Sequence, residues 1–544
     1  MEWIHSKARI IESDEIFEKN ILDNLIQELT NKLAIQASEA KTQKIVVGVY
    51  LDRGLFSYIS PVSIFQLGFT YVPIGTEYPK ERLQYILEDS CCSLIVTNEK
   101  YEHLFSTPTI CVEKINTIVK SQACILKRKK KNDAAYIIYT SGTTGVPKGI
   151  EISYDALEVF TKDVAFLKLF HENMKLLSVT SVTFDLFFLD SIVALHYGAT
   201  VIIGPEGVLQ YKKMLKLVHQ YKANTFIMTP SRMQLLFDLD HSNNFLDYTR
   251  TVCMGGESIP LNLLRRLQKK KMRILNLYGP SETTIFSTVA DLSQSDEVHV
   301  GKPLAHTEIH ISKEEDQGSY GEVVICGAGV GLGYIHCADE RFYCKNGKRY
   351  FKTGDVGYID LAGNLHLKGR RDHQIKHNGY RIELEEIERV AASFANVNAA
   401  VAFRSSKGKL VLCYFTDKYV DVSFLRMHLR EYLPKYMIPF NIVQMEKLLI
   451  DTNGKINRNE VIRMYENKDG NRVKEKVLEI IGDIVNEKIS DCIFSLKDIE
   501  SIDFIKVIIE IEEYYKFEFD DEMLSYKKLD TVESLINYVL LKTT

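Results

Sequence analysis

The sequence predicts an α/β protein with a large part built on parallel-type sheets, a small mixed α+β part and an all-α C-terminal bundle. Up to about residue 370, β-branched runs alternate with longer helical patterns, which is typical of parallel sheets covered by helices on both faces. Beyond that point shorter strands and helices mix, and three amphipathic helical patterns follow from about residue 473. The length of 544 residues is enough for several such units.

The large part is expected to span residues 1–370. Apolar strand patterns occur at 45–51, 92–97, 134–140, 199–204 and 225–229, and helical patterns occur at 79–89 and 211–221. The longest uncharged stretch, 54–76, contains Pro61 and Pro73. We interpret it as a buried helix followed by a strand rather than as a membrane span.

The small part is expected to span residues 371–465, with strands near 399–404 and 410–415 and helices near 384–393 and 422–433. Residues 466–472, with the sequence ENKDGNR, are polar and predict a linker. Helical patterns at 473–489, 502–515 and 531–542 then predict a separate bundle over 473–544.

Charge and cysteine usage exclude several classes of protein. Lysine and arginine number 68 against 72 aspartate and glutamate, a net charge of −4, so we expect no nucleic-acid partner. The basic run at 127–131 is interpreted as a solvated loop. The ten cysteines form no CxxC pair and no zinc-type spacing, and the first residues do not resemble a secretory signal. We therefore expect a cytoplasmic protein with reduced thiols and no membrane association.

The segment YTSGTTGVPKGI, residues 139–150, carries the sharpest chemical signal. Its glycines, hydroxyl side chains and Lys148 follow an apolar strand, and such a loop can surround a polyphosphate with backbone N–H groups. Lys148 is followed by Gly149, which disfavours the GxxxxGK[ST] loop of kinase-like folds. A plain surface turn is the alternative interpretation.

This loop resembles the signature of the adenylate-forming enzymes, which include acyl-CoA synthetases, luciferases and nonribosomal-peptide adenylation domains. Eight further segments resemble the family's other motifs in the expected order: 69–90, 184–190, 276–284, 321–334, 350–357, 369–388, 433–439 and 453–458. The resemblance covers about residues 45–460, with a shortened N-terminal region. It implies an adenylate-forming fold and a two-step reaction. A carboxylate attacks the α-phosphate of ATP, and a thiol then takes the acyl group.

The resemblance also assigns roles to individual residues. Ser141, Gly142, Thr143, Thr144, Gly145 and Lys148 would hold the phosphates, and Gly256, Asn276, Tyr278, Gly279, Ser281, Asp355 and Arg370 would bind the rest of the nucleotide. Glu282 would offer a hard oxygen to Mg²⁺. Lys455 matches the adenylation lysine, although on residue type alone it is one lysine in a polar turn. Asp372 matches the hinge, and Gly379 lies in the segment that would line the thiol tunnel.

Asp185 bears on the substrate class. A carboxylate within the apolar segment 184–190 is costly to bury unless a cation pairs with it, and the resemblance assigns it to a substrate α-ammonium. The alternative is an aspartate that caps a helix. The resemblance implies the pocket Asp185, Leu186, Leu189, Ile227, Cys253, Gly255, Leu277, Ile285 and Phe286. Its neutral side chains predict a small or aliphatic amino acid, with glycine first and alanine second.

The segment 497–522 resembles the second helix of acyl- and peptidyl-carrier proteins, with Ser501 at the 4′-phosphopantetheine position. Glu500 stands where that family usually has aspartate. A serine at a helix start suits a phosphodiester, because free N–H groups favour negative charge there. The alternative is that Ser501 only caps the helix.

Together these features predict a ligase that loads an amino acid onto its own carrier domain, with ATP, Mg²⁺ and 4′-phosphopantetheine as cofactors. The expected partners are a phosphopantetheinyl transferase and downstream biosynthetic enzymes, and a small activator protein is compatible with the resemblance. Two alternatives stay open. One is a ligase that passes a non-amino carboxylic acid to CoA or to a separate carrier, and the other is a non-catalytic scaffold.

Overall fold

The computed structural model describes most of the chain. Outside the description are residues 1–2, 41, 43, 116–132, 142–145, 165–168, 206–209, 240–243, 313–319, 373, 378–379, 407, 417, 446–455, 486–495, 497–500, 521–528, 530 and 543–544, and the side chains of 467–472, 475, 501–502, 533, 537 and 540–541. The basic run at 127–131 lies outside the described residues. No helix among the described residues is both long enough and apolar enough to cross a membrane.

The chain divides into two compact units. The larger comprises Met1–Glu386 with Arg430–Met437, and the smaller comprises Ile387–Leu429 with Ile438–Thr544. From the sequence we predicted a domain boundary after residue 370. In this structure residues 371–386 group with the larger unit.

One sheet of the larger unit has nine strands in the order β15-β14-β13-β12-β11-β9-β10-β1-β2. Its strands are β1 (Arg9–Glu12), β2 (Glu15–Glu18), β9 (Lys175–Ser178), β10 (Thr200–Ile203), β11 (Thr225–Met228), β12 (Thr251–Gly255), β13 (Arg273–Tyr278), β14 (Thr288–Asp291) and β15 (Lys302–Pro303). The six strands from β13 to β1 in this spatial order pair in parallel. At one edge β2 is antiparallel to β1, and at the other β14 and β15 are added in antiparallel pairs.

A second sheet has seven strands in the order β18-β8-β7-β4-β3-β5-β6. They are β3 (Val46–Tyr50), β4 (Thr70–Pro73), β5 (Leu94–Thr97), β6 (Thr109–Cys111), β7 (Ala134–Thr140), β8 (Lys148–Ser153) and β18 (Gly333–Tyr334). Again the central strands are parallel, and β8 and β18 are antiparallel. The α/β prediction is confirmed, but the sheets are mixed rather than parallel throughout.

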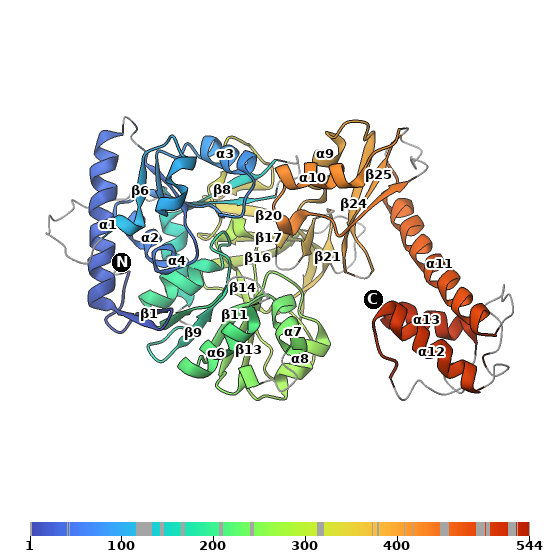
Figure 1. Cartoon of the computed structure of the whole chain (residues 1–544). Coiled ribbons are helices and arrows are strands. Elements are labelled where there is room, and N and C mark those ends of the chain that lie inside the picture. The colour runs from blue at the N-terminus through green and yellow to red at the C-terminus, as the bar shows by residue number, and fades with distance from the viewer. Residues whose placement is uncertain are drawn as a thin grey trace. The chain divides into compact units, whose positions relative to one another are not determined.

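Helices cover these two sheets, as Figure 1 shows. They are α1 (Lys19–Glu39), α2 (Leu55–Gln66), α3 (Lys80–Asp89), α4 (Tyr154–Asp163), α5 (Ala194–His196), α6 (Tyr211–Tyr221), α7 (Pro230–Leu239) and α8 (Leu261–Gln268). The uncharged stretch 54–76 forms α2 and β4, as predicted. Ten of the twelve residues of α2 are buried, which explains why this helix shows no polar face.

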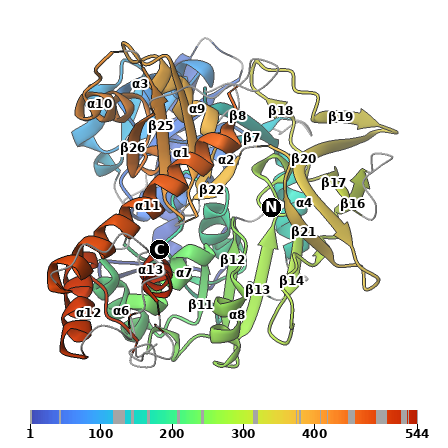
Figure 2. The ribbon, with the colours of Figure 1, turned by 90° about the vertical axis from the view of Figure 1, so that its right-hand side faces the viewer.

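A third sheet of the larger unit is antiparallel. Its strands are β16 (Thr307–Ser312), β17 (Gly321–Gly327), β19 (Phe342–Lys345), β20 (Lys348–Ile359) and β21 (Leu365–Arg370). Figure 2 shows this sheet beside β13 and β14. It is followed by a two-stranded hairpin of β22 (Ile375–His377) and β23 (Tyr380–Ile382).

The smaller unit contains a three-stranded sheet of β24 (Ala399–Arg404), β25 (Leu410–Phe415) and β26 (Asn441–Met445). Helix α9 (Leu384–Ala392) precedes β24 in the sequence, and α10 (Val422–Tyr432) lies between β25 and β26. The predicted strands and helices of this part are therefore present.

The C-terminal segment forms α11 (Arg458–Val485), α12 (Ser501–Tyr515) and α13 (Val532–Lys542). The start of α11 packs on the three-stranded sheet through Val461 and Tyr465, and its end shares a hydrophobic core with α12 and α13. The predicted linker 466–472 lies inside α11. It still connects two cores, but as a helix, since a single Gly470 does not stop a helix that is fixed at both ends.

Candidate active site

The larger unit contains a cavity at the carboxyl ends of β7, β12 and β13, which the β22–β23 hairpin also lines. Parallel α/β sheets place their ligand sites at such strand ends, because loops of variable sequence follow there. Every residue that lines this cavity belongs to the larger unit.

Twelve of the residues predicted from the sequence line this cavity. The nucleotide set contributes Ser141, Gly256, Gly279, Ser281, Asp355 and Arg370, and the substrate set contributes Asp185, Leu186, Gly255, Leu277, Ile285 and Phe286. The structure therefore brings residues from five separate motifs to one place.

Other predicted residues lie elsewhere. Leu189, Ile227 and Cys253 are buried in the hydrophobic core and do not line the cavity. Asn276 donates its amide N–H to the carbonyl of His299 over 2.9 Å. Gly142, Thr143, Thr144, Gly145, Gly379 and Lys455 lie outside the described residues, and of Ser501 only the backbone is described.

Asp185 is buried at the cavity wall with one unsatisfied oxygen. Its Oδ1 accepts the N–H of Leu186 over 2.8 Å, and its Oδ2 accepts no hydrogen bond from the described residues. Burial raises the pKa of Asp185 to about 6, against smaller opposing effects from Ser281 and the Leu186 N–H. A helix cap would bind an N–H two or three residues further on, so the contact to Leu186 does not explain why this carboxylate is buried.

The cavity wall around Asp185 is apolar and crowded. A Cβ atom on Gly255 would lie 3.1 Å from the Leu277 carbonyl oxygen and 3.9 Å from Leu186 Cδ1. Ile285 and Phe286 are almost fully buried beside them. The space over Gly255 is therefore short, and the side chains nearest to it, Leu186 and Leu277, are apolar.

On the polar side, Arg370 joins two carboxylates. Its guanidinium donates to Asp372 over 2.6 and 2.7 Å and to Asp355 Oδ1 over 2.8 Å. Burial acts to raise the pKa of Asp372, but the hydrogen bonds and charge of Arg370 outweigh it and lower that pKa. The Tyr278 hydroxyl donates to Asp355 Oδ2 over 2.6 Å, so Tyr278 supports the cavity from behind rather than lining it.

Glu282 is fully buried and is paired with a cation from the hairpin. Arg381 Nη1 donates to both carboxylate oxygens, over 2.8 and 3.0 Å, and the Tyr334 hydroxyl donates to Oε1 over 2.5 Å. Burial opposes ionisation, but the Arg381 charge, the Tyr334 hydrogen bond and smaller contributions together outweigh it and lower the pKa of Glu282. Both oxygens are engaged, so Glu282 is not free to ligate a metal in this arrangement.

Of the residues predicted to hold the phosphates, Ser141 and Lys148 are described, and both have protein partners. The Ser141 hydroxyl donates to the Arg381 carbonyl over 2.9 Å and accepts the Glu383 N–H over 3.0 Å. Lys148 Nζ lies 3.8 Å from Asp339. The Arg381 carbonyl on β23 and the N–H of Glu383, just after that strand, therefore occupy the Ser141 hydroxyl.

Twelve residues that line the cavity were not predicted as site residues, and Gln374, Lys376, Tyr380, Arg381 and Tyr436 are among them. The Tyr380 ring stacks on Tyr436 with 3.8 Å between centroids and contacts Phe184 at 4.8 Å. Burial lowers the pKa of Lys376 despite the charge of Asp355. Gln374 and Lys376 are polar residues at alternate positions, a pattern that could have predicted that they face the same side. Nothing in the sequence singled out Tyr436.

Comparisons with known proteins agree with this architecture. The sequence model of the family described as AMP-binding enzyme matches residues 28–335. A dimodular nonribosomal peptide synthase of Bacillus subtilis (strain 168) is 32% identical over 438 residues, which are 76% of this chain. The chain spans only 18% of that relative's length.

Two solved structures share the fold. An adenylation domain from Vibrio cholerae, in complex with glycyl-adenosine-5′-phosphate, is 21% identical with a TM-score of 0.72 over 85% of this chain and 95% of its own. A holo nonribosomal peptide synthetase protein containing adenylation and PCP domains is also 21% identical, with a TM-score of 0.72 over 99% of this chain and 94% of its own. The α/β fold is thus the adenylate-forming fold. Because the family model covers more than half of its residues, the chain belongs to the AMP-binding enzyme family.

Proposed function

We propose that this chain activates a small α-amino acid with ATP as an aminoacyl-AMP and transfers it to 4′-phosphopantetheine on its own Ser501. The observation that carries the first half is Asp185, a buried carboxylate with a free oxygen in an otherwise apolar part of the cavity. An uncompensated buried charge is costly, and a ligand ammonium would remove that cost.

Residues of the cavity would orient the two substrates for in-line attack. Asp185 would hold the ammonium, so that the substrate carboxylate points away from the apolar wall and toward the nucleotide. Arg370 and Tyr278 hold the Asp355 carboxylate in place. Asp355 would accept hydrogen bonds from the ribose hydroxyls. Ser141 would bind phosphate through the same hydroxyl that now contacts β23.

The apolar wall supports a short substrate side chain. Leu186 and Leu277 crowd the space over Gly255, and neither side chain carries a charge. Glycine is the first candidate and alanine the second, although one methylene changes binding by only about 1–3 kcal/mol. The structural relative from Vibrio cholerae was solved with a glycyl adenylate, which agrees with this order.

The second half of the proposal rests on the C-terminal helices. Ser501 is the first residue of α12, and Asp503 lies in its first turn. Helices α11, α12 and α13 share one core, and a relative with adenylation and PCP domains covers nearly the whole chain. A tethered thiol arm would raise the effective concentration of the acyl acceptor, and its thiol would supply the nucleophile of the second step.

Magnesium is expected with ATP, and Glu282 stays its predicted ligand. In the present arrangement Arg381 neutralises Glu282, so the carboxylate could accept a metal only after Arg381 leaves it. Arg381 and the metal would then compete for the same two oxygens.

Amino-acid-dependent exchange of pyrophosphate into ATP tests the first step. We expect glycine or alanine to support exchange, and Asp185→Asn to reduce it by at least roughly 100-fold, the scale of a broken buried ion pair. Asp190→Asn is the matched control, because Asp190 is also a buried aspartate with a pKa raised by burial to about 6, but it does not line the cavity. Exchange with a non-amino acid that survives Asp185→Asn would instead support a ligase for other carboxylic acids.

Intact mass tests the second step. The chain is treated with a phosphopantetheinyl transferase and CoA, and then with ATP, Mg²⁺ and amino acids. We expect one pantetheine increment that Ser501→Ala removes, followed by one aminoacyl increment. A chain that gains no pantetheine would contradict the carrier assignment and leave the exchange result standing.

A further inference from the structure

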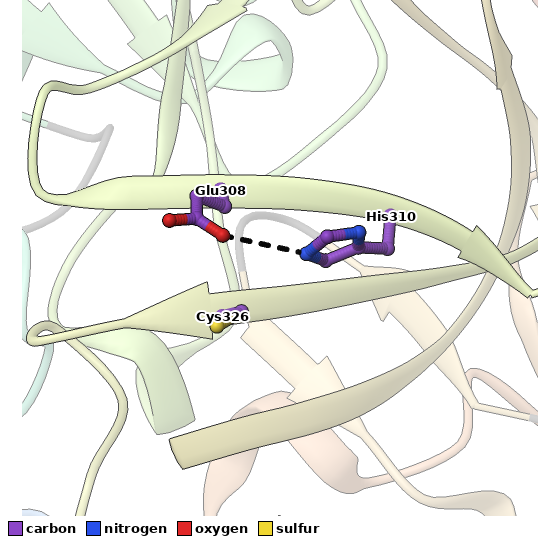
Figure 3. Close-up of side chains that lie close together, drawn as sticks. All are labelled: Glu308, His310 and Cys326. Atoms are coloured by element: carbon purple, nitrogen blue, oxygen red, sulfur yellow. Dashed lines mark ion pairs between the residues drawn. The ribbon is translucent and has the colours of Figure 1, made fainter. Parts of the chain in front are cut away.

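Three side chains of types that can bind a metal lie close together on the third sheet. Glu308 and His310 lie on β16 and Cys326 lies on β17, and their nearest ligand atoms are all within 4.8 Å of one another. Figure 3 shows the Glu308 carboxylate directed at the His310 ring, with Cys326 on the neighbouring strand. None of the three lines the active-site cavity.

The antiparallel ladder creates this cluster. Glu308 is directly opposite Cys326 in the register of β16 and β17, and His310 is two residues further along, so it shares the face of Glu308. Cys326 is at least 16 positions from the other two residues. For that reason the spacing of cysteines and histidines in the sequence did not predict this cluster.

The separation of the ligand atoms suits a tetrahedral ion. His310 Nε2 lies 3.6 Å from Glu308 Oε2. At ordinary zinc bond lengths, tetrahedral ligands lie roughly 3.4–3.6 Å apart. No separation in the cluster exceeds 4.8 Å, so a side-chain movement of about 1 Å would bring the three ligand atoms to this spacing.

The chemical types of the three ligand groups indicate which metal ion would bind. Thiolate, imidazole and carboxylate together are typical zinc ligands, whereas Mg²⁺ and Ca²⁺ prefer oxygen alone. We propose that Glu308, His310 and Cys326 bind one Zn²⁺ ion, with the fourth tetrahedral position open to solvent. Binding forms a bond from zinc to each of the three side chains and releases the thiol proton to water.

The neighbours of the cluster affect its affinity in known directions. Lys348 Nζ lies 2.5 Å from Glu308 Oε1, the oxygen that does not face His310. It fixes the carboxylate, but its charge repels a cation. Tyr350 is opposite Cys326 on β20 and hydrogen-bonds to its thiol. The buried thiol thus forms the base of the site, and the exposed Glu308 and His310 form its mouth.

Cobalt is the probe that reports thiolate ligation directly. The full chain, freed of metal by a chelator, is titrated with Co²⁺ and followed by absorption. We expect a thiolate-to-cobalt charge-transfer band and tetrahedral d–d bands that saturate at one equivalent, and one equivalent of Zn²⁺ should abolish them. Absence of the charge-transfer band in the wild-type chain would overturn the proposal.

Variants assign the site. Cys326→Ser should remove the charge-transfer band, and His310→Asn should weaken cobalt binding by more than roughly 100-fold, since even an outer partner of a ligand is worth 10–100-fold. Cys344→Ser is the matched control, because Cys344 is an exposed cysteine on β19 of the same sheet, and it should leave the titration unchanged. Circular dichroism checks that each variant is folded.

Lys348→Gln sharpens the test. Glutamine can still donate to Glu308 Oε1 but carries no charge, so cobalt should bind at least roughly threefold more tightly. A cobalt band that survives Cys326→Ser, or that Cys344→Ser removes, would place the metal elsewhere. Pyrophosphate exchange by these variants is measured in parallel, and it should be unchanged whether or not the zinc proposal holds.

Discussion

Two buried carboxylates of the larger unit, Asp185 and Glu282, have opposite electrostatic surroundings. Burial raises the pKa of Asp185 to about 6, whereas for Glu282 the Arg381 charge and the Tyr334 hydrogen bond, with smaller contributions, outweigh burial and lower the pKa. Asp185 has an oxygen with no partner among the described residues, and Glu282 has both oxygens bound by Arg381. The difference shows that burial alone does not define a ligand site. What matters is whether the protein itself supplies the counter-ion.

Asp190 supports this distinction. It is fully buried, and burial raises its pKa to about 6 as well. Its Oδ2 accepts the Ser178 hydroxyl over 2.6 Å, and the nearby Arg53 partly offsets its charge. Asp190 faces protein rather than the cavity, so its similar pKa carries no implication for a substrate.

The largest expected effect comes from breaking the buried ion pair between Glu282 and Arg381. Asp185 has no such pair among the described residues. Glu282→Gln would leave the Arg381 guanidinium buried with only the weaker contact to Glu383, at 3.2 Å. We expect the larger unit to lose about 3–5 kcal/mol of unfolding free energy, as for other buried pairs that lose one partner. Fluorescence of the single tryptophan, Trp3, follows this unit during urea unfolding, because Trp3 is buried within it.

The double variant Glu282→Gln, Arg381→Gln is the control for that measurement. It removes both charges together, so its cost should be smaller than the sum of the two single variants, by about 0.5–3 kcal/mol. Strict additivity would show that the two side chains do not interact in solution.

Asp185→Asn should have the opposite effect on stability. The folded-state pKa of about 6 is above the ordinary 3.8, so the native state binds a proton more tightly than the unfolded state does. The native state is therefore favoured below pH 4 and penalised progressively as the pH rises to 6. Asparagine removes the penalty, so the variant should gain on the order of 3 kcal/mol at pH 7, and this gain should vanish near pH 4. A variant that is less stable at pH 7 would contradict the unpaired state of Asp185.

The same titration should appear in substrate binding. An ammonium ligand needs ionised Asp185, and the ionised fraction falls about tenfold per pH unit below a pKa of about 6. The KM for the amino acid should therefore rise steeply between pH 6 and pH 5 while kcat changes little. Initial rates of pyrophosphate exchange at several pH values measure this. A KM that is flat across that interval would mean that Asp185 does not bind the ammonium.

Most of the fold followed from the sequence, because its signals are local. Alternating strand and helix patterns predicted the central strands, and Pro61 did not obscure the buried helix α2. The antiparallel edges and the helical state of 466–472 were missed, since pairing direction and helix continuation depend on tertiary packing.

The candidate site was predicted in part, and the missing contacts have a common cause. Asp185 could be singled out because a charge in an apolar run is unusual. Arg381 could not be assigned to Glu282, because 99 positions separate them and only the fold brings them together. Ile227 and Cys253 could not be separated from true cavity residues, since an apolar side chain has the same hydrophobicity in a core and in a pocket.

The smallest expected effect comes from changing the wall of the pocket without changing its charge. In Gly255→Ala the new Cβ would lie 3.1 Å from the Leu277 carbonyl oxygen and 3.3 Å from Leu277 Cβ, so Leu277 must shift by a few tenths of an ångström. We expect the ratio of kcat/KM for glycine over alanine to rise by about tenfold, the lower end of the range for one methylene. The pH dependence of KM should stay as in the wild type, because Asp185 is untouched. If Gly255→Ala changed that pH dependence but not the substrate ratio, the apolar wall and the carboxylate would not be the separate determinants of size and charge that their positions indicate.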